Sequence, residues 1–302
     1  MFSQAVFSQN VVWYLFLAGA GGGLAFVVFL LDSFLRYWRP WLFGQYRVLM
    51  VPALFTGIAF VALGTVFLLF DLGRPERILS FVTDLRPNTL TLGAWSIVAF
   101  LALSALQLLV RLRFAAATPK PVHIAIRWAT AAGAASVMVY TGLLFQSFGA
   151  LHFLASPLLP LLFVLSSLSC GFALLLLIGF LRQPEGLSLR PSVRLTRAHL
   201  PLLILELVVL AGYLLLMAFG TQTAAASTAR LLNGDYALAF WGGVVALGLL
   251  LPLGMELILR GHASWNSTAV YALACLGGAL ALRFCFLAAA AHPDVGLGPP
   301  LI

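Results

Sequence analysis

The sequence predicts an all-α protein, a polytopic bundle of eight transmembrane helices with both termini outside. Of its 302 residues, 62% are apolar and 9% are charged, whereas a soluble domain is about half apolar and a quarter charged. The apolar residues also gather in eight stretches, each about 20 residues long, which is enough for a helix to cross a hydrocarbon core of roughly 30 Å. A water-soluble globule is therefore excluded.

The eight expected spans form a single membrane domain over residues 1–302. They cover residues 11–31, 48–70, 90–110, 126–148, 158–180, 199–219, 237–259 and 268–290. Even the longest connection, between the second and third spans, is too short for a soluble domain. The residues before the first span lack a basic region, and no small-residue cleavage site follows, so we expect this span to be a retained helix rather than a signal peptide.

The distribution of basic residues predicts the orientation. The connections after spans one, three, five and seven, with their flanks, carry 12 of the 17 Lys and Arg residues, whereas the opposite side carries four and Arg283 lies within a span. By the positive-inside rule, both termini face the periplasm or cell exterior. The net charge of +8 therefore orients the chain in a bilayer, and we expect no nucleic-acid partner.

The chain is not expected to carry a metal centre. Cys170, Cys275 and Cys285 lie in apolar stretches without CxxC or Cys/His spacing, which argues against an iron-sulfur cluster, a zinc site or a disulfide framework. The five histidines lie at span ends or in connections, which disfavours haem b, although His199 and His262 share the inner face and leave a haem there open. Any metal redox centre then belongs to a partner.

Ionisable residues inside a membrane are expensive and are therefore the first functional candidates. They are Glu206 in span six, Glu256 near the inner end of span seven and Arg283 in span eight, with Asp71 at the outer end of span two. Arg283 and Glu206 lie at different depths and are not expected to pair directly. Arg283 could reach outward toward Asp71, and Glu206 with Glu256 could begin a proton path from the inner face. Alternatively, each is a structural charge that meets a backbone carbonyl, a hydroxyl or interfacial water.

Three further features have both a structural and a functional interpretation. Tyr140 lies deep in span four, where a phenol needs a partner and can donate to a carbonyl oxygen. The glycines at positions 19 and 21–23 indicate either close helix packing or the approach of a flat ligand. The segment from Asp71 to Phe81 holds Arg74, Glu76 and Arg77, which suits either a membrane-surface turn or docking to a charged partner.

Motifs along almost the whole chain carry a family resemblance. They are WYLFLAG from Trp13, DLGRPER from Asp71, GAWS from Gly93, YTG from Tyr140, Leu159-Pro160, SSLSCG from Ser166, the Glu206 region, FWGG from Phe240, GLLLP from Gly248 and GGALALR from Gly277. Together they resemble the NrfD-like family, the membrane subunits of polysulfide, nitrite and related molybdenum or multihaem reductases. DLGRPER is the most specific of these motifs.

The resemblance implies an eight-helix, haem-free subunit of the bacterial or archaeal cytoplasmic membrane that reacts with menaquinone or ubiquinone. It also implies a ferredoxin-like iron-sulfur subunit on the outer, periplasmic face, and through it a molybdopterin or multihaem catalytic subunit. Tyr140 matches the family's quinone-contacting tyrosine. We map Asp71 as proton acceptor and Arg283 as its counter-ion by inference. Span one lacks the histidine that some members use as a second quinone contact, so Tyr14, Gln9, Asn10 or His152 could replace it.

The expected function is electron exchange between the quinone pool and the iron-sulfur partner, with proton movement as a further hypothesis. Such a chain would hold no complete active site by itself and would work within a multi-subunit oxidoreductase surrounded by lipid. A secondary transporter would also use buried charges and glycine-rich spans, but no internal repeat is visible. A passive membrane anchor of a reductase is the third alternative.

Overall fold

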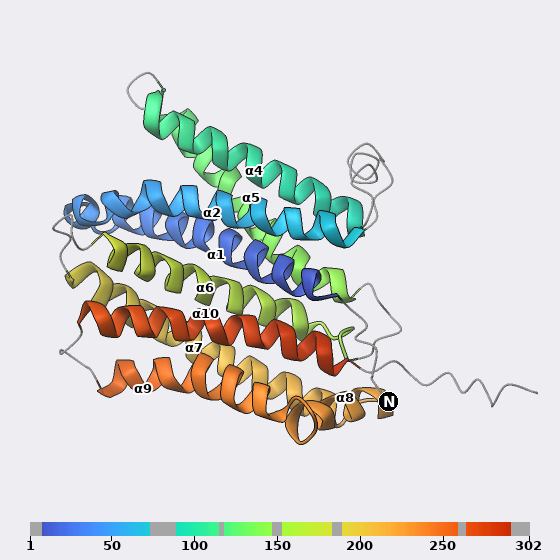
Figure 1. Ribbon diagram of the computed structural model, residues 1–302. Coiled ribbons are helices and arrows are strands. Elements are labelled where there is room, and N and C mark those ends of the chain that lie inside the picture. The colour runs from blue at the N-terminus through green and yellow to red at the C-terminus, as the bar shows by residue number, and fades with distance from the viewer. Residues whose placement is uncertain are drawn as a thin grey trace, which may run out of the picture.

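The computed structural model describes residues 8–72, 89–114, 118–146, 153–182, 189–258 and 264–290. Within these ranges, eight helices are long and apolar enough to cross a membrane (Figure 1), and no residue is in a β-strand. The predicted all-α fold with eight spans is therefore confirmed. The placement of both termini outside stays a prediction.

The helices are mostly longer than their predicted apolar cores. Their bounds are α1 Gln9–Tyr37, η1 Pro40–Leu42, α2 Phe43–Leu72, α4 Thr89–Arg113, α5 Lys120–Gln146, α6 Leu158–Leu181, α7 Arg190–Ala218, α8 Gln222–Leu232, η3 Ala239–Leu250, α9 Leu251–Ile258 and α10 Trp265–Ala289. Helix α7 begins nine residues before the predicted span 199–219, because a helix can continue through the polar interface, where hydropathy no longer marks it. The short helix α8 was not predicted, and the Thr221 hydroxyl caps it by accepting from the Ala224 amide.

Helices α1 and α6 form the centre of the bundle. Helix α1 packs against α2, α5, α6 and α10, and α6 packs against α1, α5, α7 and α10. Figure 1 shows α4 at one edge of the bundle and α8 and α9 at the other, with α2, α1, α6 and α10 between them and α5 crossing behind α2 and α1. The central position of α1 and α6 places their polar side chains away from lipid.

The glycines of α1 explain how it contacts several helices at once. A methyl group at Gly21 would lie 2.6 Å from the Gly57 carbonyl oxygen of α2. A methyl group at Gly23 would overlap the Ser167 carbonyl of α6, and one at Gly22 would lie 3.3 Å from the Ala134 carbonyl oxygen of α5. These glycines therefore allow backbones to approach closely on three sides, which accounts for them by packing.

The sequence had suggested one continuous helix for the seventh span, but the structure shows two different helix types there. Residues Ala239–Leu250 form a π-helix, and the α-helix α9 follows directly. A methyl group at Gly248 of the π-helix would lie 2.6 Å from the Cα atom of Gly278 in α10. The wider helix therefore packs backbone to backbone against α10. Such segments are frequently found at functional sites.

Candidate functional site

Arg283 is a fully buried cation at the centre of the bundle. From α10, its Nε donates to the Leu15 carbonyl of α1 at 3.2 Å, and its Nη1 donates to the Ala279 carbonyl at 2.9 Å. Two hydroxyls of α6 accept as well, Ser166 from Nη1 at 3.3 Å and Ser167 from Nη2 at 3.1 Å. The guanidinium thus connects three helices through hydrogen bonds to carbonyls and hydroxyls.

The structure gives Arg283 and Asp71 different partners. Asp71 is exposed at the end of α2 and accepts a hydrogen bond from the Ser8 hydroxyl, whereas the Arg283 side chain has no exposed surface. The expected outward reach of Arg283 toward Asp71 is therefore not observed in the described contacts. The physical reason is that carbonyl and hydroxyl acceptors already surround the guanidinium at its own depth, so it needs neither water nor a carboxylate.

A chain of hydrogen bonds leads from Glu206 toward the end of the bundle that is predicted to face inward. The Ser169 hydroxyl of α6 lies 2.8 Å from Glu206 Oε2 and 2.8 Å from His199 Nε2, both on α7. The other ring nitrogen of His199, Nδ1, lies 2.9 Å from the Tyr271 hydroxyl of α10. All four residues are buried. We call Glu206, Ser169, His199 and Tyr271 the polar chain.

Each hydroxyl in the polar chain has one proton to donate. The direction of one hydrogen bond therefore determines the direction of the next. When Ser169 donates to an ionised Glu206, it must accept from His199 Nε2–H, and Nδ1 then accepts from Tyr271. When Glu206 is protonated and donates to Ser169, every bond reverses and Nδ1–H donates to Tyr271. A proton on Glu206 therefore permits the second arrangement, although a protonated carboxyl can also still accept from Ser169 through its other oxygen.

The polar chain has electrostatic neighbours at both ends. The Ser166 hydroxyl, which accepts from Arg283, also interacts with the Glu206 carboxyl. Beside Glu206 lies a cavity of about 10 Å³ lined by Ser169, Cys275 and the π-helix residue Gly248, close to the size of one water molecule.

At its far end the polar chain approaches the predicted inner face. Tyr271 interacts electrostatically with Glu256 of α9. Glu256 in turn lies 3.9 Å from the exposed Arg197. The hydrogen-bonded part of this path therefore ends at Tyr271, and Glu256 acts on it only through its charge.

Two buried phenols lie near the opposite end of the bundle. Tyr14 of α1 and Tyr140 of α5 are both buried, and their side chains interact with each other. The Tyr140 ring lies against Gly93 of α4 so closely that a methyl group there would overlap it. Within the described residues, the Tyr14 hydroxyl meets no partner with hydrogen-bond geometry. Because Arg283 donates to the carbonyl of Leu15, the next residue, this pair lies next to the buried cation.

The remaining predicted positions have separate outcomes. His152, Arg74, Glu76 and Arg77 lie outside the described residues. Both ring nitrogens of His199 contact hydroxyls, and His262 lies outside the described residues.

The metal-binding residue types are likewise dispersed in the described ranges. No group of three His, Cys, Asp or Glu side chains there could hold a metal ion. The three cysteines are buried and unpaired.

Ser169, His199 and Tyr271 were not predicted as members of a site. His199 was expected at the end of a span, whereas the residue lies nine positions inside α7 and is fully buried. One signal was available: His199 and Glu206 are seven residues apart, two helical turns, and therefore share a face. The serine and tyrosine had no comparable signal, because hydroxyls are common in membrane helices.

The fold and these contacts define a multi-pass membrane protein with a buried polar chain between its helices. The sequence profile described as polysulphide reductase, NrfD matches residues 1–292, and the chain therefore belongs to the NrfD family. This confirms the resemblance carried by the motifs and is consistent with a membrane subunit of a reductase complex.

Two individual relatives match over nearly the whole chain, and a third matches over about half of it. The chain is 26% identical over 309 residues to Protein NrfD of Escherichia coli strain K12, covering 95% of each protein. It is 27% identical over 322 residues to the C subunit of polysulfide reductase from Wolinella succinogenes, covering 92% of this chain and 94% of that subunit. A third relative, Protein NrfD homolog of Haemophilus influenzae, is 26% identical over 156 residues, about half of each protein.

Proposed function

We propose that this chain exchanges electrons between the quinone pool, menaquinone or ubiquinone, and a ferredoxin-like iron-sulfur subunit on the outer face. That partner would connect it to a molybdopterin or multihaem catalytic subunit in a bacterial or archaeal cytoplasmic membrane. The observation that carries the proposal is the buried Tyr14 hydroxyl, which meets no partner with hydrogen-bond geometry in the described residues and lies beside Tyr140. A buried donor of this kind fits a ligand carbonyl or hydroxyl oxygen.

Different residues of this chain would contact the quinol, accept its protons and position the contacting groups. A bound quinol supplies two electrons and two protons. Tyr140 and Tyr14 would orient its oxygens and exclude water, with His152 as a further candidate contact. Asp71 has an exposed carboxylate at the same end of the bundle and would accept a proton there. Arg283 would act through the backbone carbonyl next to Tyr14, as a positioning residue.

The charged segment after Asp71 would dock the iron-sulfur partner. Arg74, Glu76 and Arg77 follow Asp71 in sequence, and the described end of α2 contacts Ser8 next to the start of α1. Mixed charges of this density favour recognition of a charged surface and raise the association rate. Docking there would place an electron acceptor close to the phenols.

The polar chain supports the second part of the proposal, a proton path toward the inner face. Its four members are linked by contacts of 2.8 to 2.9 Å, and both ends meet charged groups, Arg283 through Ser166 and Glu256 through Tyr271. Because its hydrogen bonds can run in either direction, the polar chain would pass protons between Tyr271 and Glu206 by successive hydrogen-bond shifts. Intramembrane chains of ionisable residues serve this role in pumps and transporters.

A titration with a hydroxyquinoline oxide, a quinol mimic, tests the quinone site by fluorescence quenching. It is made on the purified chain and on the assembled complex. We expect saturable, stoichiometric binding that Tyr140→Phe weakens. The matched control is Tyr213→Phe, which removes another buried phenol that donates to the Phe153 carbonyl. Absence of saturable binding in both preparations refutes the quinone site and favours the anchor or the transporter.

Proton movement is tested separately in proteoliposomes that hold the assembled complex. Glu206→Gln keeps an oxygen that can accept from Ser169 but removes the titrating group. We expect electron transfer to continue with fewer protons moved per electron pair. An unchanged proton stoichiometry would show that Glu206 is only a structural acceptor, and the quinone site would stand without a proton path.

A further inference from the structure

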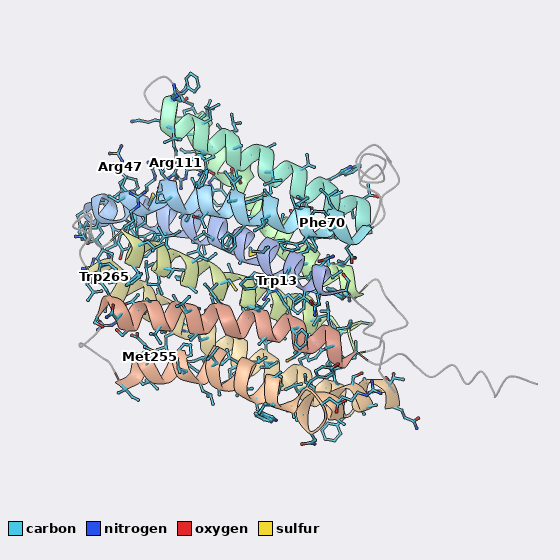
Figure 2. The ribbon with its side chains drawn as sticks, viewed as in Figure 1. Trp13, Arg47, Phe70, Arg111, Met255 and Trp265 are labelled. Carbon is cyan, nitrogen blue, oxygen red and sulfur yellow. The ribbon has the colours of Figure 1, made fainter. Side chains whose placement is uncertain are left out.

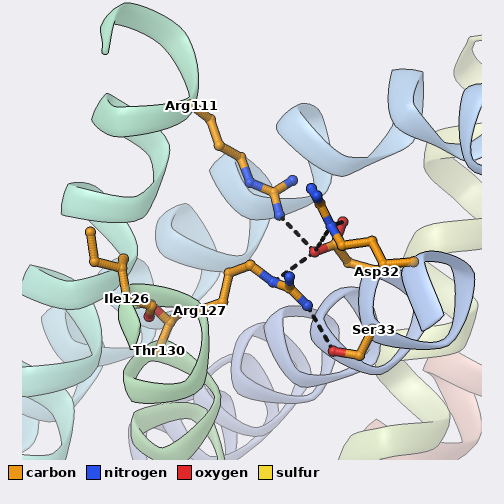
Figure 3. A network of polar contacts seen from close by, with 7 residues as sticks. Asp32, Ser33, Arg111, Ile126, Arg127 and Thr130 are labelled. Atoms are coloured by element: carbon orange, nitrogen blue, oxygen red, sulfur yellow. Dashed lines mark hydrogen bonds and ion pairs between the residues drawn. The ribbon is translucent and has the colours of Figure 1, made fainter. Parts of the chain in front are cut away.

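A second group of buried charges lies in the other half of the bundle, outside the polar chain. Asp32 of α1 has no exposed side-chain surface and contacts three guanidiniums. The distances to its Oδ2 are 2.7 Å from Arg127 Nε, 3.1 Å from Arg36 Nε and 3.5 Å from Arg111 Nη2 (Figure 3). Arg127 also donates to the Ser33 hydroxyl at 2.8 Å. Side chains from α1, α4 and α5 therefore meet at one carboxylate.

This group carries more positive charge than Asp32 can balance. Three arginines against one carboxylate leave two positive charges in excess. The Arg36 side chain is 48% exposed, whereas those of Arg127 and Arg111 are only 8% and 15% exposed. Charges in such positions are normally paired, because desolvating an unpaired ion is costly. Each guanidinium has five N–H donors, and Asp32 engages a single nitrogen on each arginine. Donors therefore remain for a further anion.

A cavity adjoins this excess charge. Its volume is about 510 Å³, and its lining includes Arg36, Arg111 and Arg127, in the range of small-ligand sites. Two more cations, Arg47 and Lys120, line it as well, which raises the excess to four positive charges against Asp32. Figure 2 shows Arg47 and Arg111 at the same end of the bundle.

The lining also has an apolar part. Met50, Val51 and Ile126 belong to it together with the cations. A soluble anion would gain nothing from these side chains, whereas an acyl chain would cover them. The positive-inside rule assigns this end to the cytoplasmic leaflet, which is rich in anionic lipid, and basic pockets between helices on that side bind lipid headgroups.

We propose that this cavity binds the phosphodiester headgroup of an anionic phospholipid, with the upper part of an acyl chain against its apolar wall. Asp32 holds the three arginines around one point, and the phosphate supplies the negative charge that they lack. The site is distinct from the phenol pair and from the polar chain, and it does not depend on the quinone proposal. A neutral quinone headgroup would leave the excess charge unbalanced.

The test is a lipid titration of the full chain in a zwitterionic detergent, followed by native mass spectrometry and thermal unfolding. The probes are phosphatidylglycerol, phosphatidylcholine and inorganic phosphate. We expect phosphatidylglycerol to bind and to raise the unfolding temperature, with little effect of phosphatidylcholine. Equal effects of the two lipids would overturn the proposal. Equal binding of inorganic phosphate would show a site for a soluble anion instead.

Two matched double variants locate the site. Arg47→Gln with Lys120→Gln removes lining cations that are exposed and do not contact Asp32, so the fold should persist. The control is Arg39→Gln with Arg113→Gln, which removes two exposed cations that do not line the cavity. We expect the first pair to weaken phosphatidylglycerol binding about tenfold or more, since each cation near a lipid phosphate changes affinity about fivefold. Equal weakening by the control pair would reduce the effect to general surface attraction and refute the site.

Discussion

Replacing Ser169 with alanine removes the one hydroxyl that joins Glu206 to His199. The change deletes two contacts of 2.8 Å and leaves a buried carboxyl and a buried imidazole nitrogen without that partner. A hydrogen bond to a charged group contributes about 1.5–3 kcal/mol and a neutral one about 1 kcal/mol in water-soluble proteins. Hydrogen bonds within membrane proteins average about 0.6 kcal/mol. The free energy of unfolding should therefore fall by between about 1 and 4 kcal/mol.

The assay for Ser169→Ala combines equilibrium unfolding in mixed micelles with proton movement in proteoliposomes. The control is Ser136→Ala, because that hydroxyl is exposed and bonds only to the Ala132 carbonyl of its own helix at 2.9 Å. We expect the control to change the free energy of unfolding by less than about 0.5 kcal/mol. Ser169→Ala should also reduce the protons moved per electron pair. A variant with wild-type stability and wild-type proton stoichiometry would refute the polar chain.

Two further substitutions probe the phenol pair and the buried cation. Gly93→Ala places a methyl group in the Tyr140 ring, so affinity for the quinol mimic should fall at least about tenfold. Gly212→Ala, where a methyl group meets open space, should leave that titration unchanged. Arg283→Gln and Glu206→Gln form a double-mutant cycle whose unfolding free energies should deviate from additivity by about 0.5 kcal/mol or more, because both residues share Ser166. Strict additivity would contradict that shared contact.

The number and kind of the helices followed from sequence because lipid imposes one solution on long apolar stretches. The ends of the helices could not be predicted, because hydropathy does not distinguish helix from loop in the polar interface where α7 begins. The π-helix at Ala239–Leu250 was equally hidden. Its apolar residues are equally compatible with an α-helix. Only the close contact between Gly248 and Gly278 shows how that span packs.

Site residues were predictable from the sequence where a charged or polar residue lies within an apolar segment. Glu206 and Arg283 stand out because charge is rare inside apolar spans, and Tyr140 stands out by its depth. Their partners depend on which helices are neighbours, which a single sequence does not encode locally. Ser169 became meaningful only when α6 was found to pack against both α7 and α10. The same holds for Asp32, whose arginine partners come mostly from other helices.

The buried charges around Asp32 and those around Arg283 are balanced in different ways, and Arg283 lies at the centre of the bundle. Around Asp32 the cations outnumber the carboxylate, and the proposed phospholipid would balance their excess charge. Around Arg283 the cation is surrounded by carbonyls and hydroxyls, and Ser166 connects it to the carboxyl of Glu206. Because the same guanidinium donates to the Leu15 carbonyl beside Tyr14, displacement at the phenol pair would move the cation that shares the Ser166 hydroxyl with Glu206. This physical connection would couple quinol chemistry at one end of the bundle to proton transfer toward the other.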